Sequence, residues 1–187
     1  RAFSILDLGC GDAATFAPLL EGLPIKSYRG VDLSEPALTL ARKNLSDLAC
    51  WIDLVQADFM SALGQAEPVD AIYTSFALHH LSCERKGEFF RLSAQKLERG
   101  GLLLVADVRR REGESLPDYH RNYCDWLRAT MTVLADSELD GICDHLVNND
   151  FPEPAPVLHA QAEAAGLRAL EGAEPHQWHA LMVFAKD

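Results

Sequence analysis

The segment from Ile5 to Ala13 constrains the fold most, because a continuous apolar run leads into a turn that contains two glycines. It reads Ile-Leu-Asp-Leu-Gly-Cys-Gly-Asp-Ala. An apolar run of this kind is typical of a parallel strand that is covered on both faces. The glycines lack a Cβ, so their backbone can approach a ligand closely. The segment therefore predicts a strand and a turn that bind a nucleotide.

Two classes of nucleotide fit this turn. Gly9-x-Gly11-x-x-Ala14 matches the fingerprint of dinucleotide-binding folds, and the acid Asp32 follows about 20 residues further on. Asp7, two positions before the first glycine, discriminates between the classes. A carboxylate there repels a pyrophosphate but attracts an ammonium or a sulfonium group. This favours S-adenosylmethionine, and an NAD-dependent oxidoreductase is the less favoured alternative.

The chain resembles the class I, Rossmann-like methyltransferases that depend on S-adenosylmethionine, because five of their motifs occur in the expected order. These are Asp7-Leu8-Gly9-Cys10-Gly11, Gly30-Val31-Asp32-Leu33-Ser34, Gln56-Ala57-Asp58-Phe59, Asp70 to Leu81 and Leu97 to Asp107. The resemblance extends from residue 5 almost to the C-terminus. It implies a small-molecule methyltransferase with S-adenosylmethionine as its cofactor. A protein that binds this cofactor or a partner without catalysis is the second hypothesis.

Composition favours a single domain over residues 1–187, which the resemblance implies is a methyltransferase domain. The chain is 48% hydrophobic and 24% charged, and a chain of this length buries about 70% of its unfolded surface in one core. Its five cysteines form no C-x-x-C pair, which disfavours a disulfide framework and predicts a reducing, cytoplasmic location. No apolar run approaches the roughly 20 residues that span a membrane. No export signal or membrane association is therefore expected.

The formal net charge of −11 disfavours a nucleic-acid partner, because Lys and Arg side chains that neutralise phosphates supply most of the affinity for nucleic acids. We therefore expect a small-molecule acceptor. The acceptor atom is left open among oxygen, nitrogen, sulfur and carbon, and no oligomeric state is predicted.

Strands and helices alternate along the chain, which predicts an α/β fold with a doubly wound, mostly parallel seven-stranded sheet. After the first strand, parallel strands are expected at residues 27–33, 51–56, 70–75 and 102–106. Ser34 and Ser82 are predicted N-caps, and Gly100-Gly101 is predicted to end the second of these helices. The last two strands, 167–171 and 180–185, are too close in sequence for a crossover helix, so the final strand is predicted to be antiparallel.

Residues 112–150 interrupt this alternation and predict a helical insertion after strand five. Its second helix is expected to begin with a capping box, Ser137-x-x-Asp140. The insertion follows the carboxyl end of a strand, and open α/β sheets bind their ligands at that edge. We therefore expect it to roof the substrate cavity. The candidate substrate contacts are His79, Tyr119, His120 and Tyr123.

The resemblance assigns roles to residues at the ends of the first four strands. Asp32 is expected to bind the ribose diol and Asp58 the adenine amino group, with Phe59 against the adenine ring. A turn-forming acid is the alternative for Asp58. Asp7 is expected near the methionine end of the cofactor, and Ser75 near the transferable methyl group. The predicted cofactor contacts are Asp7, Gly9, Cys10, Gly11, Asp32, Leu33, Asp58, Phe59 and Ser75.

Methyl transfer from a sulfonium is an in-line displacement that mainly requires alignment and the exclusion of water. Where the acceptor must lose a proton, His80 is the candidate base, because imidazole titrates near neutral pH. No metal site is predicted at His79 and His80, since adjacent positions lack the spacing of H-E-x-x-H and no acidic or cysteine partner lies at ligand spacing. His176-x-x-His179 is likewise expected to be solvated in a hairpin turn.

Overall fold

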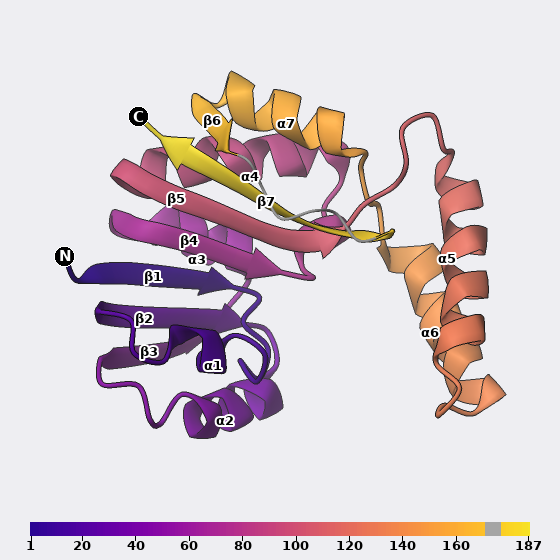
Figure 1. The fold of residues 1–187 in the computed structure, drawn as a ribbon, viewed down its shortest axis with the longest axis horizontal. Coiled ribbons are helices and arrows are strands. Elements are labelled where there is room, and N and C mark those ends of the chain that lie inside the picture. The colour runs from indigo at the N-terminus through magenta and orange to yellow at the C-terminus, as the bar shows by residue number, and fades with distance from the viewer. Residues whose placement is uncertain (171–176) are drawn as a thin grey trace.

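The computed structural model describes residues 1–170 and 177–187, which form a seven-stranded sheet with helices on both faces (Figure 1). The strand order is β3-β2-β1-β4-β5-β7-β6. Strands β1 to β5 pair in parallel, whereas β7 pairs antiparallel with both β5 and β6. The predicted mostly parallel sheet with an antiparallel last strand is confirmed.

The strand positions agree with the sequence prediction to within a few residues at most ends. The strands are β1 (Phe3–Leu8), β2 (Ile25–Asp32), β3 (Trp51–Gln56), β4 (Val69–Ser75), β5 (Leu97–Val108), β6 (Leu167–Leu170) and β7 (His179–Lys186). The helices are α1 (Ala17–Leu20), α2 (Glu35–Asn44), α3 (Phe59–Gln65), the 3-10 turn η1 (Leu78–His80), α4 (Cys83–Lys96), α5 (Leu116–Thr130), α6 (Asp136–Asn149) and α7 (Ala155–Ala164). Residues 171–176 of the predicted last hairpin lie outside the described residues.

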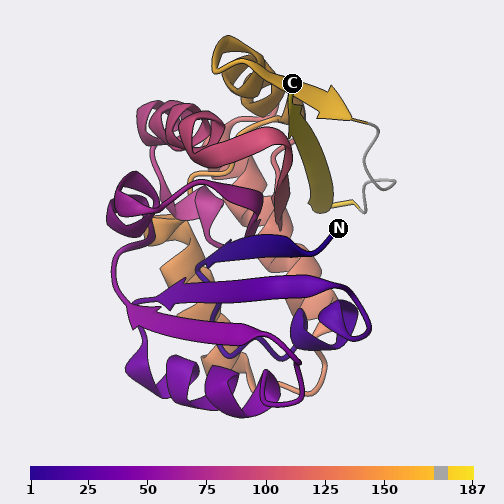
Figure 2. The same ribbon diagram turned by 90° about the vertical axis from the view of Figure 1, so that its left-hand side faces the viewer.

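The sheet separates two apolar cores, because successive side chains of a strand point to opposite faces. On one face, Leu6 and Leu8 of β1 pack with residues of α3, α4 and α7. On the other face, Ile5 of β1 packs with residues of α1 and α2. Figure 2 shows the sheet between these groups of helices. Both faces of β1 are therefore covered, as its continuous apolar sequence predicts.

Two predicted helix starts are confirmed, and one predicted helix end is wrong. The side chains of Ser34 and Ser82 accept hydrogen bonds from backbone N–H groups of the first turns of α2 and α4. Helix α4 ends at Lys96 rather than at Gly100-Gly101, because the next residue already pairs with β4. A Cβ on Gly101 would lie 2.9 Å from the carbonyl oxygen of Asp70. The glycine pair thus lets two strands approach each other.

Helices α5 and α6 form a pair that projects from the carboxyl edge of the sheet (Figure 1). The predicted capping box at Ser137 is wrong, because α6 begins at Asp136 and Ser137 lies inside its first turn. Glu138 instead accepts a hydrogen bond from the backbone N–H of Ala135 at 2.8 Å. Within the described part of the chain, no helix has the length and apolar character to cross a membrane.

Candidate functional site

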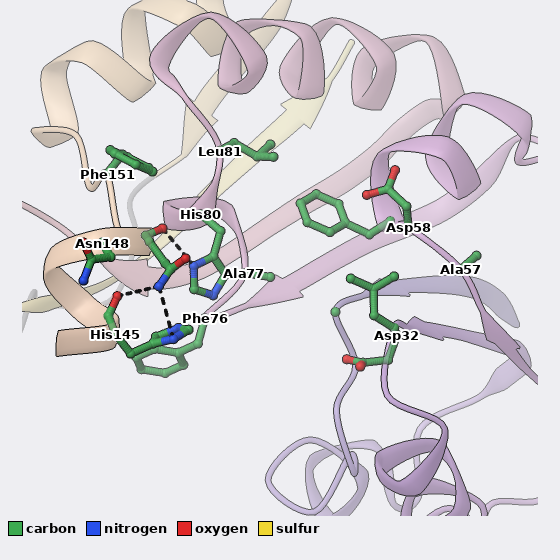
Figure 3. Close-up of a pocket in the computed structure, with 14 residues that line it drawn as sticks. Asp32, Ala57, Asp58, Phe76, Ala77, His80, Leu81, His145, Asn148 and Phe151 are labelled. Carbon is green, nitrogen blue, oxygen red and sulfur yellow. Dashed lines mark hydrogen bonds between the residues drawn. The ribbon is translucent and has the colours of Figure 1, made fainter. Parts of the chain in front are cut away.

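A cavity of about 550 Å³ opens at the carboxyl ends of β1, β2 and β3 (Figure 3). Gly9, Asp32 and Asp58 contribute the wall on the strand side. His145 of α6 and Phe151 lie on the opposite side. The insertion therefore reaches over the strand ends, where a ligand of an open α/β sheet is expected.

Gly9 is required by the packing at the end of β1. Its φ of +73° lies in the left-handed region, and an added Cβ would lie only 2.7 Å from the Cβ of Ala77. The N–H groups of Gly9 and Cys10 both donate to the carbonyl oxygen of Val31, at 2.8 and 3.0 Å. These bonds hold the glycine turn against the end of β2 and bring it close to Asp32.

Asp32 is fixed by two backbone hydrogen bonds. Its Oδ2 accepts from the N–H of Gly11 and its Oδ1 from the N–H of Ser34, each at 2.8 Å. A carboxylate offers about four acceptor positions, so both oxygens can still accept bonds from a ligand. The glycine turn and the start of α2 thus orient this carboxylate at the cavity wall.

Asp58 caps helix α3 and also lines the cavity. Its Oδ1 accepts hydrogen bonds from the backbone N–H and the hydroxyl of Ser61, at 2.8 and 2.9 Å. This is the turn-forming role that the sequence leaves open as the alternative, and it coexists with a position on the cavity wall. Phe59 also lines the cavity and packs edge-on against Phe89.

Asp7 lies beneath the glycine turn rather than on the wall of the large cavity. It is 1% exposed, and its Oδ2 accepts a hydrogen bond from the Tyr28 hydroxyl. Its Oδ1 is buried and has no hydrogen-bond partner in the part of the chain that the structure describes. Burial is the main cause that raises the pKa of Asp7 to about 7. This carboxyl is therefore poised to change charge near neutral pH.

The predicted cofactor contacts divide between two adjoining hollows. A smaller one, of about 160 Å³, is lined by Asp7, Cys10, Gly11 and Ser75, and Gly9 lines both. Asp32, Leu33, Asp58 and Phe59 line only the larger cavity. Burial raises the pKa of the Cys10 thiol, which keeps this side chain uncharged at neutral pH.

The histidine pair lies in the 3-10 turn after β4. Phe76, which precedes the turn, has a φ of +50°, an uncommon conformation for a residue with a side chain. His79 is buried, and its Nδ1 lies 2.6 Å from Oδ1 of Asp107. The backbone N–H of His79 donates to Oδ2 of the same carboxylate at 3.0 Å. Asp107, near the end of β5, therefore fixes both the ring and the backbone of His79.

Asp150 brings a second carboxylate to the pair. Its Oδ1 lies 3.6 Å from Nε2 of His79 and 3.2 Å from Nδ1 of His80. The nearby carboxylate of Asp150 is the main cause that raises the pKa of His80. The sequence-based argument that the pair has no acidic partner was therefore wrong. Asp107 was detectable as an acid near a strand end, whereas nothing in the sequence connects Asp150 with His80.

A further cavity of about 570 Å³ lies between the helical pair and the sheet edge. It is lined by His79, Asp150 and Tyr123. It shares Phe76, His80 and His145 with the cavity at the strand ends. His80 thus stands where the two cavities meet. Its side chain is 43% exposed.

Two predicted substrate contacts do not line these cavities. Tyr119 is fully buried, stacks on Tyr123 and meets the ring of Trp178 edge-on. The Nε2 of His120 lies 2.9 Å from the carbonyl oxygen of Asp150. Tyr119 therefore belongs to the core under the insertion, and His120 supports the chain segment that carries Asp150.

The expected solvation of the last histidine pair is wrong for His179. This residue begins β7, is partly buried, and its Nε2 lies 3.0 Å from the hydroxyl of Tyr123. His176 lies outside the described residues. The strand pairing with β5 brings His179 to the insertion, which its sequence neighbours do not indicate.

Residues 5–101 match the methyltransferase domain family, and this match covers more than half of the chain. The chain belongs to this family, which confirms the methyltransferase family predicted from the sequence motifs. An uncharacterized methyltransferase of Geobacillus sp. (strain WCH70) is 32% identical over 111 residues, which are 59% of this chain and 50% of that protein. The chain spans about half the length of the curated relatives it matches.

Solved methyltransferases share the fold. An O-methyltransferase family 2 protein from Planctomyces limnophilus DSM 3776, in complex with apigenin, has a TM-score of 0.69 at 15% identity, over 99% of this chain and 50% of that one. Magnesium protoporphyrin IX methyltransferase from Synechocystis PCC 6803, with bound SAM, has a TM-score of 0.65 at 12% identity, over 100% of this chain and 71% of that one. The Rossmann-like methyltransferase fold is thus confirmed.

Proposed function

We propose that this chain transfers a methyl group from S-adenosylmethionine to a small-molecule acceptor. The observation that carries the proposal is the pair of carboxylates, Asp32 and Asp58, at neighbouring strand ends of one cavity. Ribose hydroxyls and an adenine amino group are donors, which carboxylates accept in charge-assisted hydrogen bonds. Membership of the methyltransferase domain family supports this cofactor, as does the Synechocystis neighbour with bound SAM.

The charge beneath the glycine turn supports a cationic nucleotide. The unpartnered Oδ1 of Asp7 is buried beside the hollow of about 160 Å³. An ammonium or sulfonium group nearby would stabilise the ionised carboxylate, whereas a pyrophosphate would be repelled. We therefore place the methionine end of the cofactor on this side of Gly9 and its ribose and adenine against Asp32 and Asp58.

In the proposed reaction, S-adenosylmethionine supplies a methyl group on a sulfonium that is already activated as a leaving group. The bond from the acceptor atom to the methyl carbon forms as the sulfur–carbon bond breaks, which leaves a neutral thioether. Phe76 and the insertion would hold the acceptor in line and exclude water. Where the acceptor loses a proton, His80 would receive it on a ring nitrogen.

The cavity beneath the helical pair supports an acceptor of small-molecule size. Its volume of about 570 Å³ falls within the roughly 300 to 1,000 Å³ that is common for ligand pockets. Tyr123, Leu127 and Ile142 give it an aromatic and apolar lining, and His79 and His80 add polar groups. The Planctomyces neighbour in complex with apigenin, an aromatic small molecule, is consistent with this class of acceptor.

Isothermal titration calorimetry with S-adenosylhomocysteine tests the proposal. We expect micromolar binding by the wild type and at least a ~10-fold loss in Asp32→Ala, since each charge-assisted bond contributes about 1.5–3 kcal/mol. Asp47→Ala is the matched control, because Asp47 is exposed and does not line this cavity. Undiminished binding by Asp32→Ala, or stabilisation of the wild type by NAD but not by S-adenosylhomocysteine, would contradict the proposal.

A second measurement separates methyl transfer from cofactor binding without catalysis. S-adenosylmethionine with a labelled methyl group is incubated with the wild type and a mixture of metabolites. We expect label in a small-molecule product and formation of S-adenosylhomocysteine. Tight cofactor binding without any transfer of label would favour the non-catalytic hypothesis.

A further inference from the structure

We propose that His79, His80 and Asp150 form a binding site for a divalent transition-metal cation such as Zn²⁺, where the two cavities meet. One ring nitrogen of each histidine and one carboxylate oxygen lie within 4.8 Å of one another. Imidazole nitrogen and carboxylate oxygen are ligands that Zn²⁺ takes in proteins, and catalytic zinc sites use three protein ligands with a fourth position left open. The residue types therefore match this kind of centre.

The separations of the donor atoms also fit. Oδ1 of Asp150 lies 3.6 Å from Nε2 of His79 and 3.2 Å from Nδ1 of His80. In a tetrahedral centre with bonds of about 2.1 Å, neighbouring ligand atoms lie about 3.4 Å apart. Small side-chain movements therefore suffice to place all three donors around one cation.

One carboxylate oxygen of Asp150, Oδ1, lacks a hydrogen-bond donor among the described residues. Asp150 is 6% exposed, and its Oδ1 accepts no hydrogen bond although it lies beside two ring nitrogens. A buried carboxylate oxygen without a partner is costly. A cation between this oxygen and the two rings would offset that cost, because it places a positive charge in direct contact with the carboxylate.

The surrounding residues orient the three ligands. The 2.6 Å contact between Nδ1 of His79 and Asp107 assigns the ring proton to Nδ1, which leaves the lone pair of Nε2 toward Asp150. A carboxylate behind a histidine ligand is the usual outer partner in metal sites. The N–H of Phe151 donates to the carbonyl oxygen of His79 at 2.8 Å, and His120 contacts the carbonyl of Asp150. The ligands are therefore held in place.

A cation at this site would influence methyl transfer, and this consequence rests on the proposed function. His79, His80 and Asp150 all line the cavity assigned to the acceptor. A cation there would bind an acceptor oxygen at its open position and lower the pKa of that hydroxyl, whose proton then passes to water. The site thus favours acceptors with a metal-binding oxygen. Nδ1 of His80 lies 3.2 Å from the carbonyl oxygen of Asn149, which assigns a proton to Nδ1 when no cation is bound. On metal binding Nδ1 would release this proton to water and serve as a ligand, and the cation would replace His80 in promoting deprotonation.

Metal binding is tested directly on the full chain after treatment with a chelator. Calorimetry with Zn²⁺ is expected to give one site per chain with a micromolar or lower Kd, and Co²⁺ to give a visible absorption spectrum of a tetrahedral centre. Asp150→Asn and His80→Ala are expected to lower the affinity for Zn²⁺ by roughly 100-fold or more. This exceeds the usual effect of losing a residue that only hydrogen-bonds to a metal ligand. Asp144→Asn, at an exposed position of α6, the helix that precedes Asp150, is the matched control and should bind Zn²⁺ like the wild type.

The outcomes separate this proposal from the proposed function. The metal site is overturned if the wild type binds neither cation, or if Asp150→Asn and His80→Ala, both folded by circular dichroism, bind Zn²⁺ as tightly as the wild type. Binding of S-adenosylhomocysteine is measured on the same samples. If the wild type binds Zn²⁺ but does not bind S-adenosylhomocysteine, the proposed methyl transfer is rejected and the metal site is retained.

Discussion

The hydroxyl of Tyr28 lies 2.5 Å from Oδ2 of Asp7 and donates a buried hydrogen bond to it. The two residues belong to the paired strands β2 and β1, directly beneath the glycine turn. Burial raises the pKa of Asp7, and this hydrogen bond acts in the opposite direction. Tyr28 therefore helps to keep a charge available under the proposed cofactor site.

Tyr28→Phe is expected to destabilise the fold near neutral pH. The substitution keeps the ring in its place but removes the hydroxyl that donates to the buried carboxylate of Asp7, a bond that contributes about 1.5–3 kcal/mol when the acceptor is charged. The decrease in unfolding free energy should be smaller at pH 5, where Asp7 is protonated. Urea denaturation of the wild type and the variant at pH 5 and pH 8 measures this decrease. An equal loss at both pH values would contradict a role that depends on charge.

The contribution of Asp7 to the free energy of unfolding should fall as the pH rises toward 7, because the pKa of Asp7 is raised from 3.8 to about 7 by folding. The folded protein holds a proton in this range that the unfolded chain has released. The contribution is complete below pH 3.8, decreases by about 1.4 kcal/mol per pH unit, and is lost above pH 7.

Asp7→Asn isolates this contribution, since the amide has the same shape and does not titrate. We expect the difference in unfolding free energy between wild type and variant to vary with pH between 4 and 7 and to level off above. Denaturant titrations across this range provide the measurement. Parallel pH profiles for the two proteins would show that Asp7 ionises normally in the folded state.

Gly9→Ala should destabilise the protein more than Gly22→Ala. Both glycines have nearly the same φ, +73° and +74°, so each alanine carries a similar backbone strain of about 1–2 kcal/mol. Only at Gly9 does the added Cβ meet another atom, the Cβ of Ala77 at 2.7 Å. The contact should add about 1–3 kcal/mol. Thermal denaturation compares the two variants, and equal losses would refute the steric explanation.

Lys86→Met is expected to lower the free energy of unfolding by about 2 kcal/mol or more. The ammonium of this buried lysine donates to the carbonyl oxygens of Leu81 and Phe151, and a methionine would leave both carbonyls without this donor. Phe151 follows Asp150, so the variant should also weaken Zn²⁺ binding at the proposed site. Lys43→Met, at an exposed position of α2, is the control. A stable Lys86→Met protein would show that water satisfies these carbonyls.

The elements that local signals determine were predicted well. The strand at residues 51–56 and the N-caps Ser34 and Ser82 occur as expected, because alternation, apolar runs and capping hydroxyls act within a few residues. The antiparallel last strand also followed from a connection too short for a helix. The end of α4 was predicted wrongly, since the pairing of Leu97 with Val69 overrides the glycines.

The site was predictable only where its residues end successive strands. Asp32 and Asp58 share one edge of the sheet because parallel strands end there together. The contact between His80 and Asp150 joins residues far apart in the sequence, and it depends on how the insertion returns to the sheet. The burial of Tyr119 has the same origin, since the packing of α5 on Trp178 decides which of its aromatic residues face a cavity.

The walls of the cavities derive from separate stretches of the chain, with strand ends on one side and the helical pair α5 and α6 on the other. Mutations that reshape the helical pair leave the backbone hydrogen bonds around Asp32 untouched. If the proposed function holds, replacement of this pair during evolution would diversify the range of accepted molecules while the proposed nucleotide half of the protein stays under constant selection.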